Sequence, residues 1–596
     1  MLEELYSDSG LLNKEVEFRH GLNIILGKYG RNKQESGING IGKSSLIRLI
    51  DYALLSEGAD TLFAQKRYDF LRDEHHTITL KLKILGESHY IRRSFGKKKG
   101  IIEFGTSPNR LSDYEIREIR SILIDKMFPI TDESVRYEGD RFRTLFNFFV
   151  KDDLDQRQRS DPLDFFPYRA TAHEKFAYNF FLLGLPNDAL FEYGSRLKRY
   201  RDQQKFVKTL TEQIERSTGK KLSEFKSERL VLEQRVSLLE KSLRDYKFLE
   251  KYKEIEASLS TINDQINDRL KTFHSLSRKL KRLRELSVSS LNIDVAEVTS
   301  MYEELSTAFA ALVKKQLDEI IEFKKTLIEN RLRHNLEREK HIESSLREVE
   351  LEITALENQR AALLHQLEEK GELDSIANTY EELAAEKSAL EKNVQILHRI
   401  DETNGELQKI DIDISEARVS IYEDIQGAED KLDALRTLFR EIVDNAILTS
   451  SDLSASAYFD VSTTSNTRRN QIPFNVGIEV PKSDALGRFN LKLVAYDLLV
   501  FLHSVRTQRQ LPRFLVHDGV FHGIAKRTMV NTLNYVHRQS QLYPGFQYIV
   551  TFNEDEIYIP EERKELDGTF DFSLDGAVVA RYTDSDSGMI FKRAFV

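Results

Sequence analysis

The chain has 596 residues, 31% of them charged, a formal net charge of -9 at pH 7 and no cysteine. The lack of cysteine excludes disulfides, thiol catalysis and cysteine zinc sites, and the negative net charge means that any DNA binding must use a local basic patch. No apolar stretch approaches the roughly 20 residues that a membrane helix needs, and no basic segment leads into an apolar run at the N-terminus, so we expect a soluble, cytoplasmic protein without membrane contact.

A phosphate-binding loop follows the first strongly apolar strand, which we predict over residues 22–26. Residues 36–45 read SGINGIGKSS and contain the spacing G-x-x-x-x-G-K-S, whose backbone N–H groups can wrap a triphosphate. In this spacing Lys43 reaches the β and γ phosphates, and Ser44 offers its hydroxyl to Mg²⁺. Residues 45–54 have helical apolar spacing, so the positive end of a helix dipole would point at the phosphates.

The rest of the N-terminal segment is typical of a mixed α/β domain. Three stretches between residues 77 and 104 alternate apolar and polar side chains and are separated by turns with glycine, which predicts antiparallel strands. Residues 141–149 are mostly aromatic. We expect this run to belong to the core, and the alternative is that Arg141 or Arg143 contacts phosphate.

The middle of the chain has the pattern of a coiled coil. Residues 187–472 contain no proline, so a helix can run through most of this stretch. Polar breaks near residue 290 and at 370–374 suggest where the helices turn, and the unequal arms suggest an extra joint or a folded-over helix on the return path. Apolar residues recur at spacings of four and three, for example Leu232, Val236, Leu239 and Leu243, or Ile342, Leu346, Val349 and Ile353.

The C-terminal segment returns to an α/β pattern. Residues 513–518 form a short apolar strand that ends in Asp518, and such a carboxylate is what a nucleotidase uses to hold Mg²⁺ beside the phosphates. Around it we predict strands over residues 458–461, 474–480 and 546–551, and an amphipathic helix over 489–504.

The two ends of the chain need each other. The N-terminal segment has a phosphate loop without an evident metal-binding strand, and the C-terminal segment has the strand without the loop. An antiparallel coiled coil would bring them together as two halves of one parallel sheet. We therefore expect three segments: the N-terminal half of a head at 1–186, a helical hairpin at 187–446 and the C-terminal half of the head at 447–596.

This arrangement resembles the SMC, RecN, RecF and SbcC group of ABC-type ATPases, because residues 39–44, NGIGKS, match the family pattern N-G-x-G-K-S. The resemblance implies an α/β ABC-type ATPase head with a long inserted antiparallel α-helical coiled coil. It also implies that the heads of two copies close on ATP and Mg²⁺. The family's signature serine and glycine, which contact the γ phosphate on the opposite head, map to Ser483 and Gly487. The other implied contacts are Asn39, Gly40, Gly42, Lys43, Ser44 and Ser45 for the nucleotide, and Ser44 and Asp518 for the metal.

Several positions depart from the family pattern, and two of them bear on hydrolysis. Asp518 is followed by Gly519 where the family has a catalytic glutamate, and Phe552 follows the last predicted strand where the family has a histidine. A second register would put His517 in the metal position and Asp518 in the base position, although carboxylate chemistry favours Asp518 as the metal ligand. We expect ATP hydrolysis to be slow or to use a nearby carboxylate such as Glu554.

Residues 517–523 and 548–555 look like a family of SMC-like proteins of bacterial multi-component ABC systems, among them antiphage and antiplasmid defence operons such as Lamassu. The resemblance implies a subunit that senses double-stranded DNA and controls a separate nuclease-like effector through a small accessory subunit. The alternative is a DNA-repair ATPase of the RecN or SbcC kind. A purely structural coiled coil is hard to reconcile with the phosphate loop.

Basic clusters are the candidate DNA contacts, weighed against ordinary solvated faces. Phosphate contacts need only charge and reach, so affinity should fall steeply with salt. A third cluster is less favoured, because it lies near the expected far end of the coil, at residues 278–284. Two clusters are favoured, one in the head and one at the root of the coil: Lys97, Lys98 and Lys99, and Arg196, Lys198, Arg199 and Arg201.

A metal-dependent nuclease site in this chain is the sharpest other possibility. The candidates form two separate sets, His75 with His76, and Asp567 with Asp571 and Asp575, and neither set has the convergent spacing of a dedicated metal site. We therefore do not expect intrinsic nuclease activity.

Overall fold

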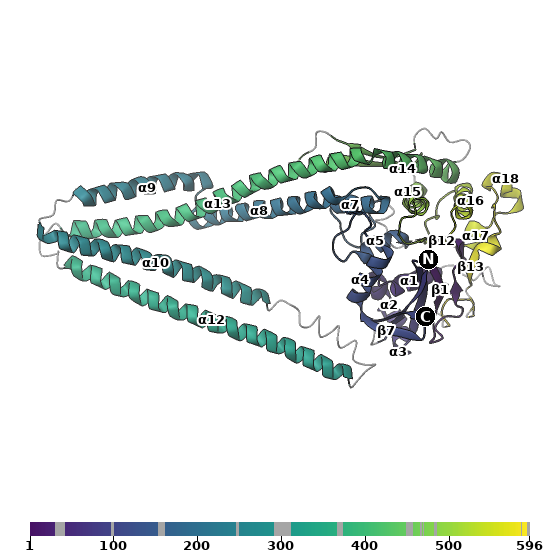
Figure 1. Cartoon of the computed structure of the whole chain (residues 1–596), viewed down its shortest axis with the longest axis horizontal. Coiled ribbons are helices and arrows are strands. Elements are labelled where there is room, and N and C mark those ends of the chain that lie inside the picture. The colour runs from purple at the N-terminus through teal and green to yellow at the C-terminus, as the bar shows by residue number, and fades with distance from the viewer. Residues whose placement is uncertain are drawn as a thin grey trace. The chain divides into compact units, whose positions relative to one another are not determined.

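The computed structural model describes residues 1–29, 42–96, 100–152, 161–245, 250–290, 312–365, 373–448, 457–464, 468, 470–481, 486–583, 585 and 587–592. The chain forms two compact units (Figure 1). The first unit contains Met1–Lys198 and Ile412–Val596, and the second contains Arg199–Ser300 and Phe309–Asp411.

A parallel sheet joins the two ends of the chain in the first unit. Its strand order is β13-β3-β12-β11-β8, and every neighbouring pair is parallel. β3 is buried along its whole length, as expected for a central strand with helices on both faces. Both neighbours of β3 come from the C-terminal segment, which confirms that the two segments build one sheet. The strands are β3 (Gly21–Gly27), β8 (Val150–Lys151), β11 (Phe514–His517), β12 (Gln547–Asn553) and β13 (Val578–Tyr582).

A second, antiparallel sheet belongs almost wholly to the N-terminal segment. Its order is β2-β1-β4-β5-β6-β7, and it contains the three strands predicted between residues 77 and 104. The alternation of buried and partly exposed positions in β5 is the pattern of a sheet with one face on the core. The strands are β1 (Leu2–Tyr6), β2 (Val16–Glu17), β4 (Thr77–Ile84), β5 (Glu87–Ser94), β6 (Ile101–Ser107) and β7 (Arg110–Glu115).

Helices and one hairpin complete the first unit. The aromatic run at 141–149 becomes α5, with Phe142, Phe146, Phe148 and Phe149 fully buried, so this run is core as expected. The hairpin pairs β9 (Tyr458–Thr463) with β10 (Phe474–Glu479). The longer helices are α1 (Lys43–Ala53), α4 (Ile116–Met127), α5 (Phe142–Phe149), α7 (Ala172–Leu183), α14 (Glu429–Ile442), α15 (Leu486–Arg506) and α16 (Lys526–Leu542). The short ones are α2 (Glu57–Phe63), α3 (Asp69–Asp73), α17 (Glu554–Ile557), α18 (Lys564–Asp567) and α19 (Leu574–Ala577).

The second unit is built from long antiparallel helices. α9 pairs with α13 through the ion pairs Arg235–Glu386 and Glu240–Lys387, and α10 pairs with α12, beside which it runs in Figure 1. The predicted seam residues Leu232, Val236 and Val349 are buried. The helices are α8 (Asp188–Thr218), which continues from the first unit, α9 (Leu222–Asp245), α10 (Glu250–Ser290), α12 (Leu312–His365) and α13 (Leu373–Gly427). The breaks predicted near 290 and at 370–374 fall largely on residues outside the described ranges.

An extra joint lies on the outgoing path, between α8 and α9, while the return path, where the sequence suggested one, passes through residues 366–372, which lie outside the described ranges. Gly219 ends α8 with a φ of 69°, a conformation that favours glycine. Between the contacts Gln203–Glu406 and Lys226–Asp401 the outgoing chain advances by 23 residues and α13 by only five. The outgoing helices α8 and α9 therefore contain more residues than the facing stretch of α13 needs. The only sign of this in the sequence is Gly219, which has no proline beside it.

Candidate nucleotide-binding site

The end of the phosphate loop starts α1 at the edge of the parallel sheet. Gly42 precedes the helix with a φ of 110°, and a Cβ atom there would lie 2.2 Å from the side chain of Ile590. Only glycine fits this position. The first turn of α1 contains no acidic residue, so no carboxylate of the helix itself would repel an anion there. The predicted contacts Asn39 and Gly40 lie outside the described residues.

Asp518 lies directly after β11 and faces the start of α1. Its side chain is 2% exposed, it accepts a 2.5 Å hydrogen bond on Oδ1 from Thr551 Oγ1, and its backbone N–H donates to Lys151 O. Burial raises the pKa of Asp518, and hydrogen bonds from Thr551 and Ser44 partly oppose this shift. Ser44 and Asp518, which the sequence predicted as partners, are therefore in contact.

The second carboxylate oxygen of Asp518 makes this pair fit for a metal ion. Oδ2 is buried and has no hydrogen-bond partner in the described part of the chain. A buried carboxylate oxygen without a donor is costly unless a cation or water meets it. Hydroxyl and carboxylate oxygens are the ligands that Mg²⁺ prefers, so Ser44 and Asp518 suit the magnesium of a nucleotide.

Lys43, the loop lysine, lies beside the end of the neighbouring strand β12. Its Nζ donates a 2.5 Å hydrogen bond to Asn553 Oδ1, and Asn553 N–H donates to Glu556 Oε2 at 2.7 Å. Glu556 Oε1 is paired with His522 Nδ1 at 2.5 Å. The sequence did not predict these contacts of Asn553, Glu556 and His522. The available signals were that all three residues follow two strands expected beside the loop strand, and that His522 and Asn553 lie in the stretches 517–523 and 548–555.

Glu554, the carboxylate that the sequence suggested for hydrolysis, has a different neighbour. Its Oε1 lies 3.5 Å from Lys28 Nζ, and both side chains are 37% exposed. Lys28 follows the end of β3, so this pair bridges two adjacent strands of the sheet. The pair is a partly solvated link between strands.

His517 lies in a buried polar network behind the site. Its Nδ1 is 2.8 Å from the Tyr548 hydroxyl and its Nε2 is 3.0 Å from Asp497 Oδ2. Asp497 Oδ1 lies 3.7 Å from Lys151 Nζ, so β11, β8 and α15 meet at paired charges. Because both ring nitrogens of His517 are engaged here, the geometry favours Asp518 and not His517 beside Ser44.

One of the two predicted signature residues lies at the start of α15. Ser483 is outside the described residues, and Gly487 is the second residue of the helix. Asn490, one turn further on, donates a 3.2 Å hydrogen bond from Nδ2 to His522 O. The start of α15 is thus tied to the loop that carries His522.

The predicted DNA contacts differ in how far they are already engaged. Lys97, Lys98 and Lys99 lie outside the described residues. Arg196 donates to Asp413 O at 2.6 Å and pairs with Glu192 at 2.9 Å, so it holds α8 against α13. The other three members of this cluster are exposed along α8, where they can meet an anion: Lys198, Arg199 and Arg201. In the cluster at 278–284, Arg284 pairs across the coil with Glu339 and Glu343.

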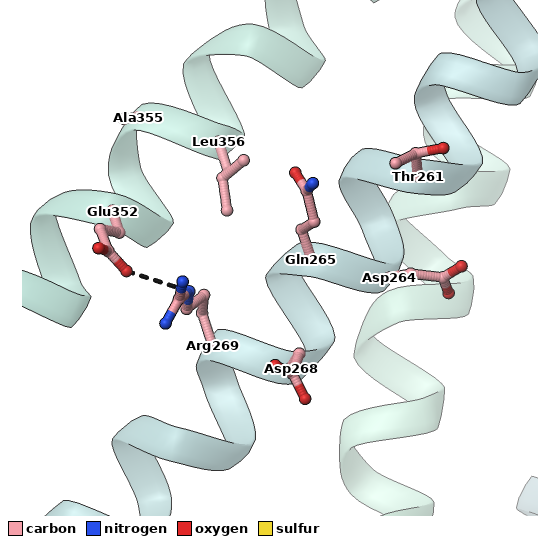
Figure 2. Close-up of a pocket in the computed structure, with 8 residues that line it drawn as sticks. All are labelled: Thr261, Asp264, Gln265, Asp268, Arg269, Glu352, Ala355 and Leu356. Carbon is pink, nitrogen blue, oxygen red and sulfur yellow. Dashed lines mark ion pairs between the residues drawn. The ribbon is translucent and has the colours of Figure 1, made fainter.

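Two other places in the described part of the chain were candidates for a site, and neither gathers the groups that a ligand would need. The described residues contain no group of three or more His, Asp or Glu that could hold a metal ion, and His76 is bonded to Ser9 and Glu74. A groove of about 750 Å³ lies between α10 and α12 (Figure 2). There Arg269 pairs with Glu352 at 3.1 Å while Asp264 points away from α12, so its polar groups do not converge on a ligand.

None of the described helices is both long enough and apolar enough to cross a membrane.

Two family models match parts of the chain. Residues 10–274 match the model of the AAA domain family, and residues 444–595 match that of an uncharacterised protein family conserved in bacteria, DUF2326. The chain is 22% identical over 587 residues to the uncharacterized protein YydD of Bacillus subtilis (strain 168), with 93% of each chain covered.

Two solved structures of Smc heads resemble the chain. One is the head domain with a coiled coil and joint from Pyrococcus yayanosii, 13% identical with a TM-score of 0.37, covering 99% of this chain and 96% of that one. The other is the head with an extended coiled coil bound to the C-terminal domain of ScpA from Pyrococcus furiosus, 12% identical with a TM-score of 0.31, covering 94% and 90%. The AAA domain match and the split parallel sheet fit an α/β ATPase-type head that both ends of the chain build, with an inserted α-helical coiled coil.

Proposed function

We propose that the chain binds ATP with Mg²⁺ at the edge of its parallel sheet and uses this binding to pair its head with that of a second copy. The observation that carries the proposal is the buried, unpartnered Oδ2 of Asp518 beside Ser44, with Lys43 as the adjacent residue of α1. Bound magnesium would neutralise phosphate charge and orient the triphosphate.

Different residues of the chain would bind the phosphates and the metal. Lys43 exchanges its bond to Asn553 for the β and γ phosphates, the backbone N–H groups at the start of α1 take further phosphate oxygens, and Ser44 and Asp518 hold the metal. Ser483 and Gly487 of a second copy complete the site from the opposite head. Each bound ATP then contacts both copies and holds the two heads together.

DNA is the ligand that we propose for the paired heads. The support is charge: Lys198, Arg199 and Arg201 are exposed on α8, and Lys97–Lys99 add a run of three in the head segment. Such contacts are to phosphate and carry no base readout. The clamped DNA duplex is therefore held through its phosphates, by charge.

The biological setting that we propose is a bacterial antiphage or antiplasmid defence complex of the Lamassu type. Paired heads on DNA would release a separate nuclease-like effector through a small accessory subunit. The resemblance at residues 517–523 and 548–555 supports this setting. Repair of the RecN or SbcC kind is the alternative, and neighbouring genes for an effector and a small third protein would distinguish defence from repair.

Lys43→Ala tests the nucleotide site. A hydrogen bond to a charged group is worth about 1.5–3 kcal/mol, so we expect at least about a tenfold loss of affinity for a fluorescent ATP analogue. Dimerisation on addition of ATP and Mg²⁺, measured by sedimentation velocity, should disappear. Lys28→Ala is the matched control, since Lys28 follows β3 at the same edge of the sheet but pairs with Glu554. A Lys43→Ala chain that still dimerises in response to ATP contradicts the proposal.

DNA binding is tested with the same protein across a salt series. Linear and closed circular DNA are each offered with and without ATP and Mg²⁺. ATP-dependent capture that weakens steeply with salt supports the clamp, and a preference for linear DNA indicates recognition of ends. If no DNA is bound under any condition, recognition belongs to a partner subunit.

A further inference from the structure

The position after Asp518 lacks the carboxylate that would activate a water molecule. Gly519 occupies it, and its backbone N–H donates to Thr551 Oγ1 at 3.1 Å. Any base for hydrolysis must therefore come from another element at the same edge of the sheet.

One other carboxylate is held at this edge by two donors. Glu556 is in α17, directly after β12, and its Oε2 accepts the backbone N–H of Asn553 at 2.7 Å. Its Oε1 is paired with His522 Nδ1 at 2.5 Å. Both oxygens are thus oriented from different elements, because His522 belongs to the loop after β11.

The charges around Glu556 keep it ionised. Burial alone would raise the pKa of Glu556, but hydrogen bonds from His522 and Asn553 N–H, and the nearby charge of Lys43, lower it. The side chain remains 28% exposed, so water reaches it. An ionised carboxylate with access to water can accept a proton.

The link to the phosphates runs through Asn553. Its side chain accepts from Lys43 Nζ while its backbone N–H holds Glu556, so the carboxylate is two hydrogen bonds away from the group that meets the γ phosphate. His522 is fixed in turn by its own backbone carbonyl, which accepts from Asn490 at the start of α15. Glu554 is held differently, by Lys28, which follows the end of β3.

We propose that Glu556 is the base for ATP hydrolysis in this chain and that His522 is its positioning residue. The inference rests on the proposed nucleotide site. The water oxygen forms a bond to the γ phosphorus as the bond from this phosphorus to the β–γ bridging oxygen breaks. The bridging oxygen leaves with the electron pair on ADP, and the water proton goes to Glu556. Bulk water then takes this proton, leaving ADP and inorganic phosphate.

Glu556→Gln tests the base. The amide carbonyl can still accept from Asn553 N–H, so the fold of α17 is kept while the proton acceptor is lost. General-base catalysis is worth about 10²–10⁴-fold, so we expect turnover to fall by at least about 100-fold. Affinity for a fluorescent ATP analogue should stay within about twofold of wild type, and the ATP-bound dimer should persist longer in sedimentation. Asp555→Asn is the matched control, an exposed carboxylate of the same helix.

His522 is tested by removal and partial restoration. His522→Ala should lower turnover without loss of ATP affinity, and His522→Asn should restore part of it, since an amide NH₂ can replace the Nδ1 donor. A purely structural role would instead lower ATP affinity and dimerisation together with turnover.

The outcomes separate the inference from the function on which it rests. A wild-type chain that does not bind ATP overturns the proposed function. A chain that binds ATP and dimerises, but in which Glu556→Gln hydrolyses ATP at the wild-type rate, overturns only the role of Glu556. The role of Glu556 is also overturned if Glu554→Gln loses turnover while Glu556→Gln keeps it. A wild-type chain that binds ATP without hydrolysing it overturns this role as well.

Discussion

His503 is a histidine that the fold keeps neutral. It is buried in α15, and burial lowers its pKa to about 4, with the charge of Arg509 acting in the same direction. The unfolded chain takes up a proton near pH 6.5, and the folded chain does so only near pH 4. The folded state is therefore free of this penalty above pH 6.5 and loses stability as the pH falls from about 6.5 to about 4.

We predict that His503→Gln flattens the loss of stability in this window. The full effect of one such group is about 3 kcal/mol, from 1.36 kcal/mol per pKa unit. Urea unfolding of both proteins at several pH values between 7 and 4 measures it, and the difference between them removes the contribution of the carboxylates. His20→Gln, at an exposed position, is the control. Parallel pH curves for wild type and His503→Gln would contradict the prediction.

The residues of the site were only partly predictable. Lys43 and Ser44 carry a local signature, and Asp518 ends an apolar strand, so the sequence predicted their roles and the structure brings Ser44 and Asp518 together. Asn553 and Glu556 have no such signature, since their place depends on how β12 pairs with β3. Polar residues after a strand become neighbours of a phosphate loop only once the strand order is known.

At the scale of elements, the joint between α8 and α9 depends on a small apolar cluster. Ile214 at the end of α8 and Phe225 at the start of α9 both pack against Leu397 and Ile400 of α13. Ile400 is fully buried. One helix thus holds two helix ends across the turn at Gly219.

Ile400→Ala should loosen this joint. Removing a buried isoleucine side chain costs about 2–5 kcal/mol, and the cost here falls on the packing of both helix ends. We expect a lower urea midpoint by circular dichroism and faster proteolysis near Gly219. Ile396→Ala, one turn away at a position 36% exposed, should change both measurements little. Equal proteolysis of the two variants would show that the cluster does not hold the joint.

Element type was easier to predict than element length. The alternation in residues 77–104 and the apolar seams of the coil follow from side-chain period, which is a local property. The joint was not predicted on the outgoing path because the heptad spacing resumes in α9 after Gly219 and conceals the break. The location of the joint depends on which residues of α8 and α9 lie opposite which residues of α13, and the sequence alone does not give this register.

For the whole molecule, the head depends on both ends of the chain. β3 pairs on one side with β12 and on the other with β13, and neither neighbour is N-terminal. Side chains cross the same boundary: the Tyr496 hydroxyl donates to Asn179, and Gln547 exchanges hydrogen bonds with the backbone of Leu2. An isolated N-terminal fragment would expose both edges of its most apolar strand.

We therefore predict that residues 1–198 and 412–596 fold only together. Expressed alone, 1–198 should be insoluble or aggregate. Coexpressed, the fragments should purify through a tag on one of them as a complex with equal amounts of each, and should unfold in one cooperative step. A version of the second fragment that stops at residue 543, and so lacks β12 and β13, is the control and should capture nothing. Cooperative unfolding of 1–198 alone would contradict this, since it would mean that the buried run of β3 is satisfied without the strands that flank it.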